Sequence, residues 1–251
     1  MLSSIFRGSC ALFSVVMIVT VAPAQTSTAA SATSYLDRGN AWYDRGELDK
    51  AIADYTRAIA SAPDLAAAYI NRGNARQDKG DLEGALSDYD RALELNPRDV
   101  GAYTNRGNVR QRQRDLEGAV ADYNQALELN PREVKALYNR GNIWLARAEL
   151  DKAIADFNLA IQGNPGYAMA YNNRAIARQA QGDLSGAIAD LSRAIEFDPN
   201  HARAYVNRGM ALLLQGKKAE AEQDFVRAVA LDSRMKVFIE QHRSFAFINK
   251  R

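Results

Sequence analysis

Cysteine, histidine and proline are scarce in this sequence, which has one, two and six of them in 251 residues. One thiol can form no disulfide within the chain and supplies no cysteine pair for a zinc site. His201 and His242 stand alone, without the paired spacing of metal-binding histidines, so we expect no metal site and no cofactor. So few prolines leave long stretches of the chain free to form helix.

Two further absences exclude classes of function. The sequence has no G-x-S-x-G motif, phosphate-binding loop or dinucleotide fingerprint, so we expect a protein that is not an enzyme. It also lacks an excess of charge of one sign, because 32 Lys and Arg against 30 Asp and Glu give a net charge of +2. Such a balance provides no broad attraction to a phosphate backbone, and we therefore expect no nucleic-acid partner.

The first 24 residues are typical of a secretory signal peptide. Arg7 precedes an apolar run at residues 10–21, and Ala-Pro-Ala at 22–24 places small residues where signal peptidase needs them. The run is too short to cross a bilayer of roughly 30 Å as a helix. We therefore expect cleavage after residue 24, a flexible polar leader at 25–31, and a periplasmic or secreted protein with no membrane contact after cleavage. An uncleaved N-terminal anchor is the alternative.

The rest of the chain is an internal repeat of 34 residues. Six units follow one another without a gap, at 32–65, 66–99, 100–133, 134–167, 168–201 and 202–235. With positions numbered 1–34 in each unit, position 20 is always Ala (Ala51, Ala85, Ala119, Ala153, Ala187, Ala221). Position 27 is also always Ala, and position 24 is aromatic or Leu. Positions 4, 8 and 11 share one helical stripe and positions 17, 20, 24 and 27 another, which predicts two antiparallel helices per unit.

This pattern resembles the tetratricopeptide repeat, whose signature has a large residue at 4, a small one at 8, Ala at 20 and 27, an aromatic at 24 and Pro at 32. The systematic departure is position 7, where Arg replaces the family's Leu in every unit. The resemblance implies an all-α, right-handed superhelical solenoid whose first helices line a concave groove for a protein or peptide partner. We expect residues 236–251 to form a capping helix, with Phe238, Ile239, Phe245 and Ile248 on one face. The alternative is a structural repeat protein that forms a homo-oligomer through this helix.

Asparagine recurs on the first helix of the units. It occupies position 6 in units two to six and position 9 in units one to four (Asn71, Asn105, Asn139, Asn173, Asn207; Asn40, Asn74, Asn108, Asn142). A side-chain amide both donates and accepts, so such a row can bond the backbone of an extended peptide without reading its side chains. The row resembles the asparagine ladder in the tetratricopeptide part of O-linked N-acetylglucosamine transferase, which binds peptide backbone. Recent duplication of the unit is the alternative explanation.

Two cations could add to this groove. Lys135 and Arg203 occupy position 2 of units four and six, on the same helical face as positions 6 and 9. Some family members grip a C-terminal carboxylate with three cations and two asparagines, but each window of three units here supplies only one of the cations. We therefore include Lys135 and Arg203 in the candidate groove and do not expect such a clamp.

Arg at position 7 has a constant companion, because position 23 is Asp in all six units. We predict structural ion pairs within a unit or across the junction to the next (Arg38/Asp54, Arg72/Asp88, Arg106/Asp122, Arg140/Asp156, Arg174/Asp190, Arg208/Asp224). The sequence leaves open whether the pairs are exposed, and then worth roughly 0.2–1 kcal/mol each, or partly buried, and then important for register. Trp42 and Trp144 occupy position 11, where the repeat needs a large residue, and we expect both to pack in the core rather than stack on a ligand.

Overall fold

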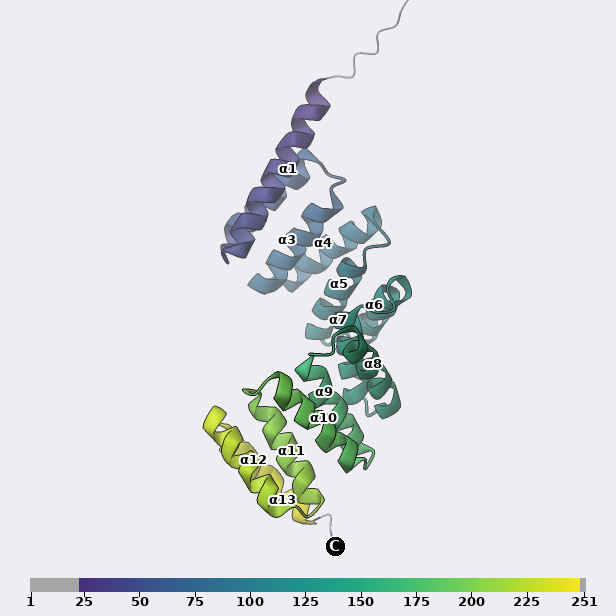
Figure 1. The fold of residues 1–251 in the computed structure, drawn as a ribbon. Coiled ribbons are helices and arrows are strands. Elements are labelled where there is room, and N and C mark those ends of the chain that lie inside the picture. Colours follow the sequence, from purple (N-terminus) through teal and green to yellow (C-terminus); the bar gives the residue numbers. More distant parts are fainter. Residues whose placement is uncertain (1–22, 249–251) are drawn as a thin grey trace, which may run out of the picture.

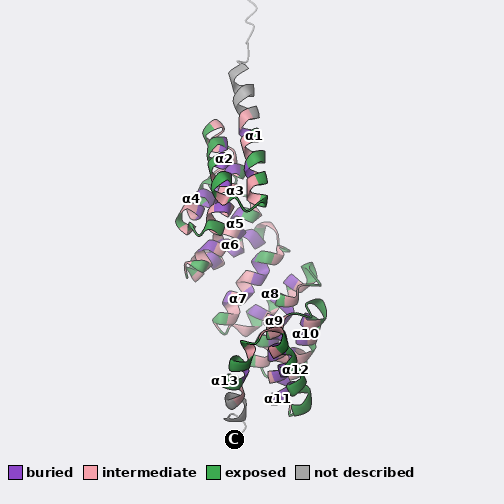
Figure 2. Ribbon diagram, turned by 90° about the vertical axis from the view of Figure 1, so that its left-hand side faces the viewer, coloured by how far each residue is buried: buried purple, intermediate pink, exposed green. Residues whose placement is uncertain are grey.

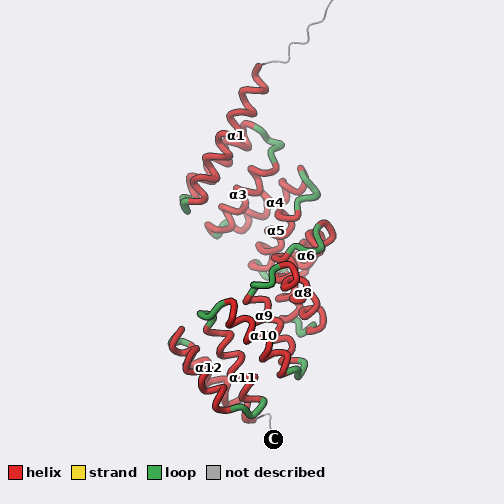
Figure 3. The backbone as a smooth tube through the Cα atoms, in the orientation of Figure 1, coloured by secondary structure: helices red, strands yellow, loops and turns green. Residues whose placement is uncertain are grey.

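The computed structural model describes the backbone of residues 23–248 and the side chains of residues 31–243. This part of the chain forms thirteen helices and no strand (Figures 1 and 3). Units one to three comprise α1 Pro23–Asp44, α2 Leu48–Ser61, α3 Ala66–Lys79, α4 Leu82–Leu95, α5 Val100–Arg112 and α6 Leu116–Leu129. Units four to six comprise α7 Val134–Ala146, α8 Leu150–Gly163, α9 Ala168–Ala180, α10 Leu184–Phe197, α11 Ala202–Leu214 and α12 Lys218–Leu231, and α13 Met235–Ile248 follows.

The helices form two layers along a superhelix. Consecutive helices pair within each unit, and the second helix of a unit packs on the first helix of the next. Each first helix also contacts the next first helix, whereas no two second helices contact each other within residues 23–248. The first helices therefore form the inner layer and the second helices the outer one (Figure 1). The expected all-α solenoid of helix-turn-helix units is confirmed.

The core lies between the two helices of each unit and at the junctions between units, where Figure 2 shows the buried residues. Alanines at positions 20 and 27 have no exposed surface in any unit. The ring at position 24 lies against position 8, and a Cβ added to Gly107 would come within 2.7 Å of the Tyr123 ring. Unit five replaces both residues, with Ala175 opposite Leu191, so the small residue at position 8 is coupled to the aromatic ring at 24.

The turn between the two helices of a unit needs a left-handed residue at position 15. Glycine provides it in four units, but Arg114 and Ala148 adopt φ values of 66° and 57° in units three and four. For residues other than glycine, this conformation costs about 1–2 kcal/mol. The acid at position 16 caps the second helix only where it is Asp. Asp81, for example, accepts a hydrogen bond from the N–H of Gly84, whereas Glu47 makes no capping bond.

The N-terminal end of the solenoid differs from the sequence prediction, whereas a helix follows unit six as expected. Residues 25–31, expected to be a flexible leader, lie in the first turns of α1, which begins at Pro23, a residue that suits a first helical turn. The predicted signal peptide covers residues 1–24, and residues 1–22 of it lie outside the described part of the chain. At the other end, α13 packs on α11 and α12 and buries Ile239, but Phe238 is 42% exposed. The side chains of Phe245 and Ile248 lie outside the described residues. None of the described helices has the length and apolar character needed to cross a membrane.

Candidate functional site

The asparagines of the inner layer bond to one another across the junctions between units. The position-6 Nδ2 donates to the position-9 Oδ1 of the preceding unit, and we call each such pair an amide rung. Four rungs join units one to five, at distances of 2.6–2.9 Å (Asn71–Asn40, Asn105–Asn74, Asn139–Asn108, Asn173–Asn142). The row that we expected to face a ligand is therefore also part of the packing between units.

The rungs change at the last junction. Unit five has Ile176 at position 9, and Asn207 donates instead to Oδ1 of Asn172, one turn earlier on α9. Asn172 is buried, and its own Nδ2 donates to Asn173. Because an equivalent acceptor replaces the lost one, the hydrogen bond across this junction is kept although the sequence pattern is broken.

Tyrosine hydroxyls from the outer layer reach the same amides. In units one to three the position-24 hydroxyl donates to the position-9 Oδ1 at 2.7–2.9 Å (Tyr55, Tyr89, Tyr123). The position-9 oxygen thus accepts two bonds. Burial raises the pKa of Tyr89, and also raises the pKa of Tyr55 to about 12 with help from Asp44, so both hydroxyls stay protonated at neutral pH.

Each rung still leaves hydrogen-bonding groups unused. The position-6 oxygens of Asn71, Asn105 and Asn139 accept no bond within the described residues. The position-9 Nδ2 groups donate none there either (Asn40, Asn74, Asn108, Asn142). All these asparagines are half-buried, so their free groups remain accessible. The row can still offer an acceptor and a donor at each of the first three junctions.

The two candidate cations lie apart. Lys135 and Arg203 are exposed near the starts of α7 and α11, two units from each other, and neither forms a hydrogen bond or an ion pair within residues 31–243. The structure therefore does not bring them together at one point, although each is free to contact a ligand.

All six expected ion pairs between positions 7 and 23 are present, and each joins the two helices of one unit. The guanidinium also reaches across the junction to a small polar side chain at position 25 of the preceding unit, as Arg106 does to Asp90 at 2.7 Å. Positions 7 and 23 therefore pair within a unit, and the contact across the junction goes to position 25 rather than to the Asp at position 23.

The carboxylates of these pairs are more deeply buried than the sequence indicated. The position-23 aspartates are all between 2% and 5% exposed (Asp54, Asp88, Asp122, Asp156, Asp190 and Asp224). The reason is their place on the second helix, one residue before the position-24 side chain, where they face the first helix of the same unit. A hydrogen bond from Arg38 lowers the pKa of Asp54 to about 2. The carboxylate is therefore buried in every unit, although the Arg38 side chain in unit one is 52% exposed. These carboxylates hold the two helices of a unit together rather than contact a ligand.

Position 11 completes the surroundings of these carboxylates. In units two, three and five it is a second arginine on the same Asp (Arg76 on Asp88, Arg110 on Asp122, Arg178 on Asp190), each at 2.8 Å. In units one and four it is tryptophan, and Trp144 packs partly buried on the core with the Lys152 ammonium 4.7 Å from its ring centroid. Trp42 is likewise partly buried against the core, with the Lys50 ammonium 4.7 Å from its ring centroid.

A second set of junction contacts follows the outer edge and was missed from the sequence. Position 14 of each unit donates to position 18 of the preceding one at all five junctions (Lys79–Asp49, Gln113–Glu83, Arg147–Glu117, Gln181–Asp151, Gln215–Ser185). A donor recurring at 14 together with an acceptor at 18 was the available signal. It was overlooked because the residue types vary while only the hydrogen-bonding role is constant.

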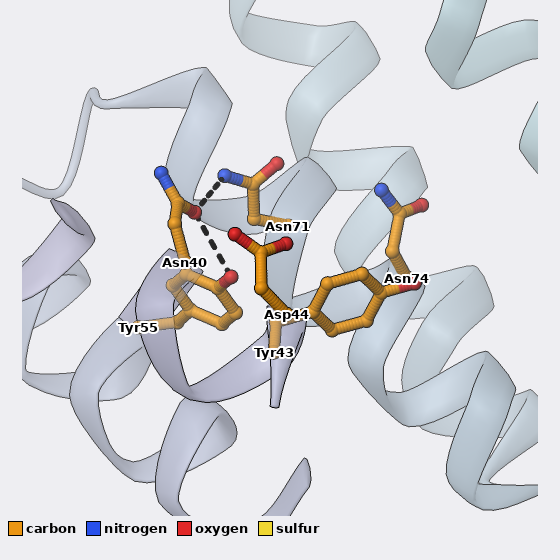
Figure 4. Close-up of a pocket in the computed structure, with 6 residues that line it drawn as sticks. All are labelled: Asn40, Tyr43, Asp44, Tyr55, Asn71 and Asn74. Atoms are coloured by element: carbon orange, nitrogen blue, oxygen red, sulfur yellow. Dashed lines mark hydrogen bonds between the residues drawn. The ribbon is translucent and has the colours of Figure 1, made fainter. Parts of the chain in front are cut away.

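The inner layer contains a pocket of about 330 Å³ at the first junction (Figure 4). It is lined by Asn40, Tyr43, Asp44, Tyr55, Asn71 and Asn74. The carboxylate of Asp44 and the three amides point the same way in Figure 4, and Asp44 has no hydrogen bond or ion pair within the described part of the chain. Tyr43 instead donates to Asp78 at 2.5 Å, and burial together with this bond raises the pKa of Tyr43 to about 12.

The histidines do not form a site. His201 lies at the start of α11, where desolvation lowers its pKa, and its Nδ1 is buried without a hydrogen-bond partner. His242 lies on α13 with its Nδ1 2.8 Å from the Phe238 carbonyl oxygen. In the described part of the chain no three His, Cys, Asp or Glu side chains are placed to hold a metal ion.

Comparison with solved structures identifies the same fold. YrrB, a tetratricopeptide protein described as having an unusual peptide-binding site, superposes with a TM-score of 0.64 at 24% identity over 76% of this chain and 97% of that one. MamA superposes with a TM-score of 0.60 at 25% identity, over 65% of this chain and 96% of that one. PilF of Pseudomonas aeruginosa superposes with a TM-score of 0.74 at 17% identity, over 82% of this chain and 94% of that one. No curated protein sequence matches the chain.

Sequence-family comparison agrees with the structures. Models described as tetratricopeptide repeat match residues 104–168 and 202–234, and one described as TPR repeat matches 39–80, 73–114 and 179–216. Together they extend over residues 39–168 and 179–234, well over half of the sequence. The chain belongs to the tetratricopeptide repeat family.

Proposed function

We propose that this chain is a non-catalytic scaffold that binds an extended peptide segment of a partner protein along its inner layer. The observation that carries the proposal is the row of amide rungs, whose unused oxygens and N–H groups repeat at the first three junctions in a fixed register. The described peptide-binding site of the similarly folded YrrB is consistent with this use of the fold.

The rungs would recognise backbone rather than side chains. Position-6 oxygens accept from peptide N–H groups, and position-9 amides donate to peptide carbonyls. A hydrogen bond of this kind contributes about 0.5–1.5 kcal/mol net. Several junctions must therefore act together, and the rung geometry supports this because it fixes each amide before the ligand arrives, which lowers the entropy lost on binding.

The proposed location is outside the cytoplasm, because residues 1–24 have the composition of a signal peptide. The partner would then be a periplasmic or secreted protein. N-terminal sequencing of the protein isolated from its source cells tests this, and we expect the mature chain to begin at Gln25. A chain that keeps its initial residues in the membrane fraction would support the uncleaved anchor instead.

The test of peptide binding must spare the rungs. Replacing position-6 asparagines by Ala would remove rung donors and loosen the junctions as well as the groove. Changing position 9 to Asp keeps the rung acceptor and removes only the free N–H groups, so we choose the double variant Asn108→Asp with Asn142→Asp. The matched control is Asn124→Asp with Asn158→Asp. It adds the same charges in the same two units, but in the outer layer, where Asn124 and Asn158 accept hydrogen bonds from Arg140 and Arg174.

Random dodecapeptides displayed on phage provide the ligands, and fluorescence anisotropy measures their affinity for the full chain. We expect the position-9 variant to weaken the selected peptides about tenfold or more, since two junctions each lose a bond of about 1 kcal/mol. The control should bind like the parent protein. The proposal would be contradicted if no peptide were selected, or if the position-9 variant bound the selected peptides as tightly as the control variant does.

A further inference from the structure

The first junction differs from the next two in what occupies the space beside the tyrosine hydroxyl. In units two and three, position 12 is Gln, and its Oε1 lies 3.3 Å from the Tyr89 hydroxyl and 2.9 Å from that of Tyr123. In unit one, position 12 is Tyr43, which bonds Asp78 instead. The Tyr55 hydroxyl keeps only its bond to Asn40, and the pocket opens beside it.

The groups that line this pocket have one charge among them. Asp44 contributes the only carboxylate among the lining side chains. The hydroxyls of Tyr43 and Tyr55 stay neutral, because burial raises the pKa of each to about 12. No lysine, arginine or histidine lines the pocket. The free oxygen of Asn71 and the lone pairs of the Tyr55 hydroxyl add further acceptors next to the carboxylate.

We propose that this pocket receives a lysine or arginine side chain of the bound peptide. The side-chain cation donates to Asp44 and to the Asn71 oxygen, and it takes the space that a glutamine amide fills in units two and three. The opposite end of the inner layer is unlike this one. There positions 9 and 13 of unit six are Met210 and Leu214, with Arg203 as the nearby charge.

The pocket therefore gives the groove a direction. A ligand with a basic residue toward unit one and apolar residues toward unit six fits better than the reversed sequence. This inference rests on the proposed peptide binding, because the pocket lies on the same layer as the rungs and shares Asn40, Asn71 and Asn74 with them.

The experiment compares two fluorescein-labelled dodecapeptides of alternating serine and alanine, one with lysine and one with norleucine at the same central position. Anisotropy with the full chain at low ionic strength should show about fivefold tighter binding of the lysine peptide, the size expected of a partly exposed charge pair. Added salt should reduce this preference, because it screens the pair.

Two variants locate the effect. Asp44→Asn removes the carboxylate and should abolish the lysine preference. Asp64→Asn is the matched control, since it makes the same charge change on an exposed loop residue of unit one away from the pocket. It should leave the preference unchanged.

The outcomes separate this inference from the proposed function. Equal binding of the two peptides, or a lysine preference that survives Asp44→Asn, overturns the basic-residue pocket and leaves peptide binding standing. Binding of neither peptide, together with an empty phage selection, overturns the proposed function and the pocket with it.

Discussion

The buried aspartates at position 23 should differ in their contribution to stability although they are equally buried. Asp122 and Asp54 are both 2% exposed. Asp122 accepts bonds from Arg106 and Arg110, whose side chains are 16% and 27% exposed, whereas both arginine partners of Asp54 are more than half exposed. We predict that Asp122→Asn destabilises the protein more than Asp54→Asn does.

The magnitude follows from how well water can replace the lost carboxylate. Removing one member of a buried ion pair costs about 3–5 kcal/mol, because the remaining charge stays desolvated. Arg106 and Arg110 keep some contact with water, so we expect about 2–3 kcal/mol for Asp122→Asn. Exposed ion pairs contribute about 0.2–1 kcal/mol in general, and the partners of Asp54 can be rehydrated in place, so its replacement should cost clearly less.

Urea unfolding followed by circular dichroism measures both losses. A terminal unit can unfold separately from the rest of a solenoid, which would by itself reduce the effect of a change in unit one. The reference pair Ala51→Gly and Ala119→Gly corrects for this, because both alanines are fully buried at position 20 of the same two units. If the ratio of the two Asp losses merely equals the ratio of the two Ala losses, the hydration argument is refuted.

Three further predictions concern turns, caps and pH. Arg114→Gly should raise the free energy of unfolding by about 0.5–1 kcal/mol by relieving a positive φ, while Gly80→Ala at φ 91° should lower it by about 1 kcal/mol. Asp81→Ala should cost about 1 kcal/mol by removing a helix cap, whereas Glu47→Ala, which removes no capping bond, should have little effect in the same urea unfolding measurements. The hydrogen bond from Arg38 lowers the pKa of Asp54 from 3.8 to about 2, so the stabilisation from this ion pair is complete above about pH 4 and is lost as the pH falls through 2. Carbon-detected NMR titration of the Asp54 carboxyl measures this pKa, and an unshifted pKa would contradict the prediction.

The sequence predicted what recurs inside one unit. The helix pairs, the small residue at position 8 and the pairing of Arg106 with Asp122 follow from identities repeated at fixed spacing, because each unit must bury the same stripe. An acid recurring at position 16 does not by itself distinguish Asp81 from Glu47 as a cap. Glutamate carries one methylene more, and in this turn its carboxylate makes no bond to the helix N-terminus.

Contacts between units were harder to predict. The sequence placed Asn105 and Asn74 on one face and suggested a ligand for both, but their mutual bond depends on how far one unit rotates on the next. That rotation is not contained in a single-unit pattern. The only indirect signal was coordinated change, since Ile176 replaces the position-9 asparagine in the one unit where Asn172 supplies another acceptor.

The same junction contacts bear on whether chains can stack end to end. At each junction the later unit donates from positions 6, 7 and 14, and the earlier unit accepts at position 9 or its substitute, at 25 and at 18. Unit six has Met210, Val226 and Ala219 at these acceptor positions, and unit one has Asp37 at the first donor position. A second chain stacked in register would place Asp37 against Met210 and the Arg38 guanidinium against Val226. An aspartate cannot donate and a valine cannot accept, so the desolvated charges would be left without partners, which is costly. The two ends of the solenoid thus oppose head-to-tail stacking in register.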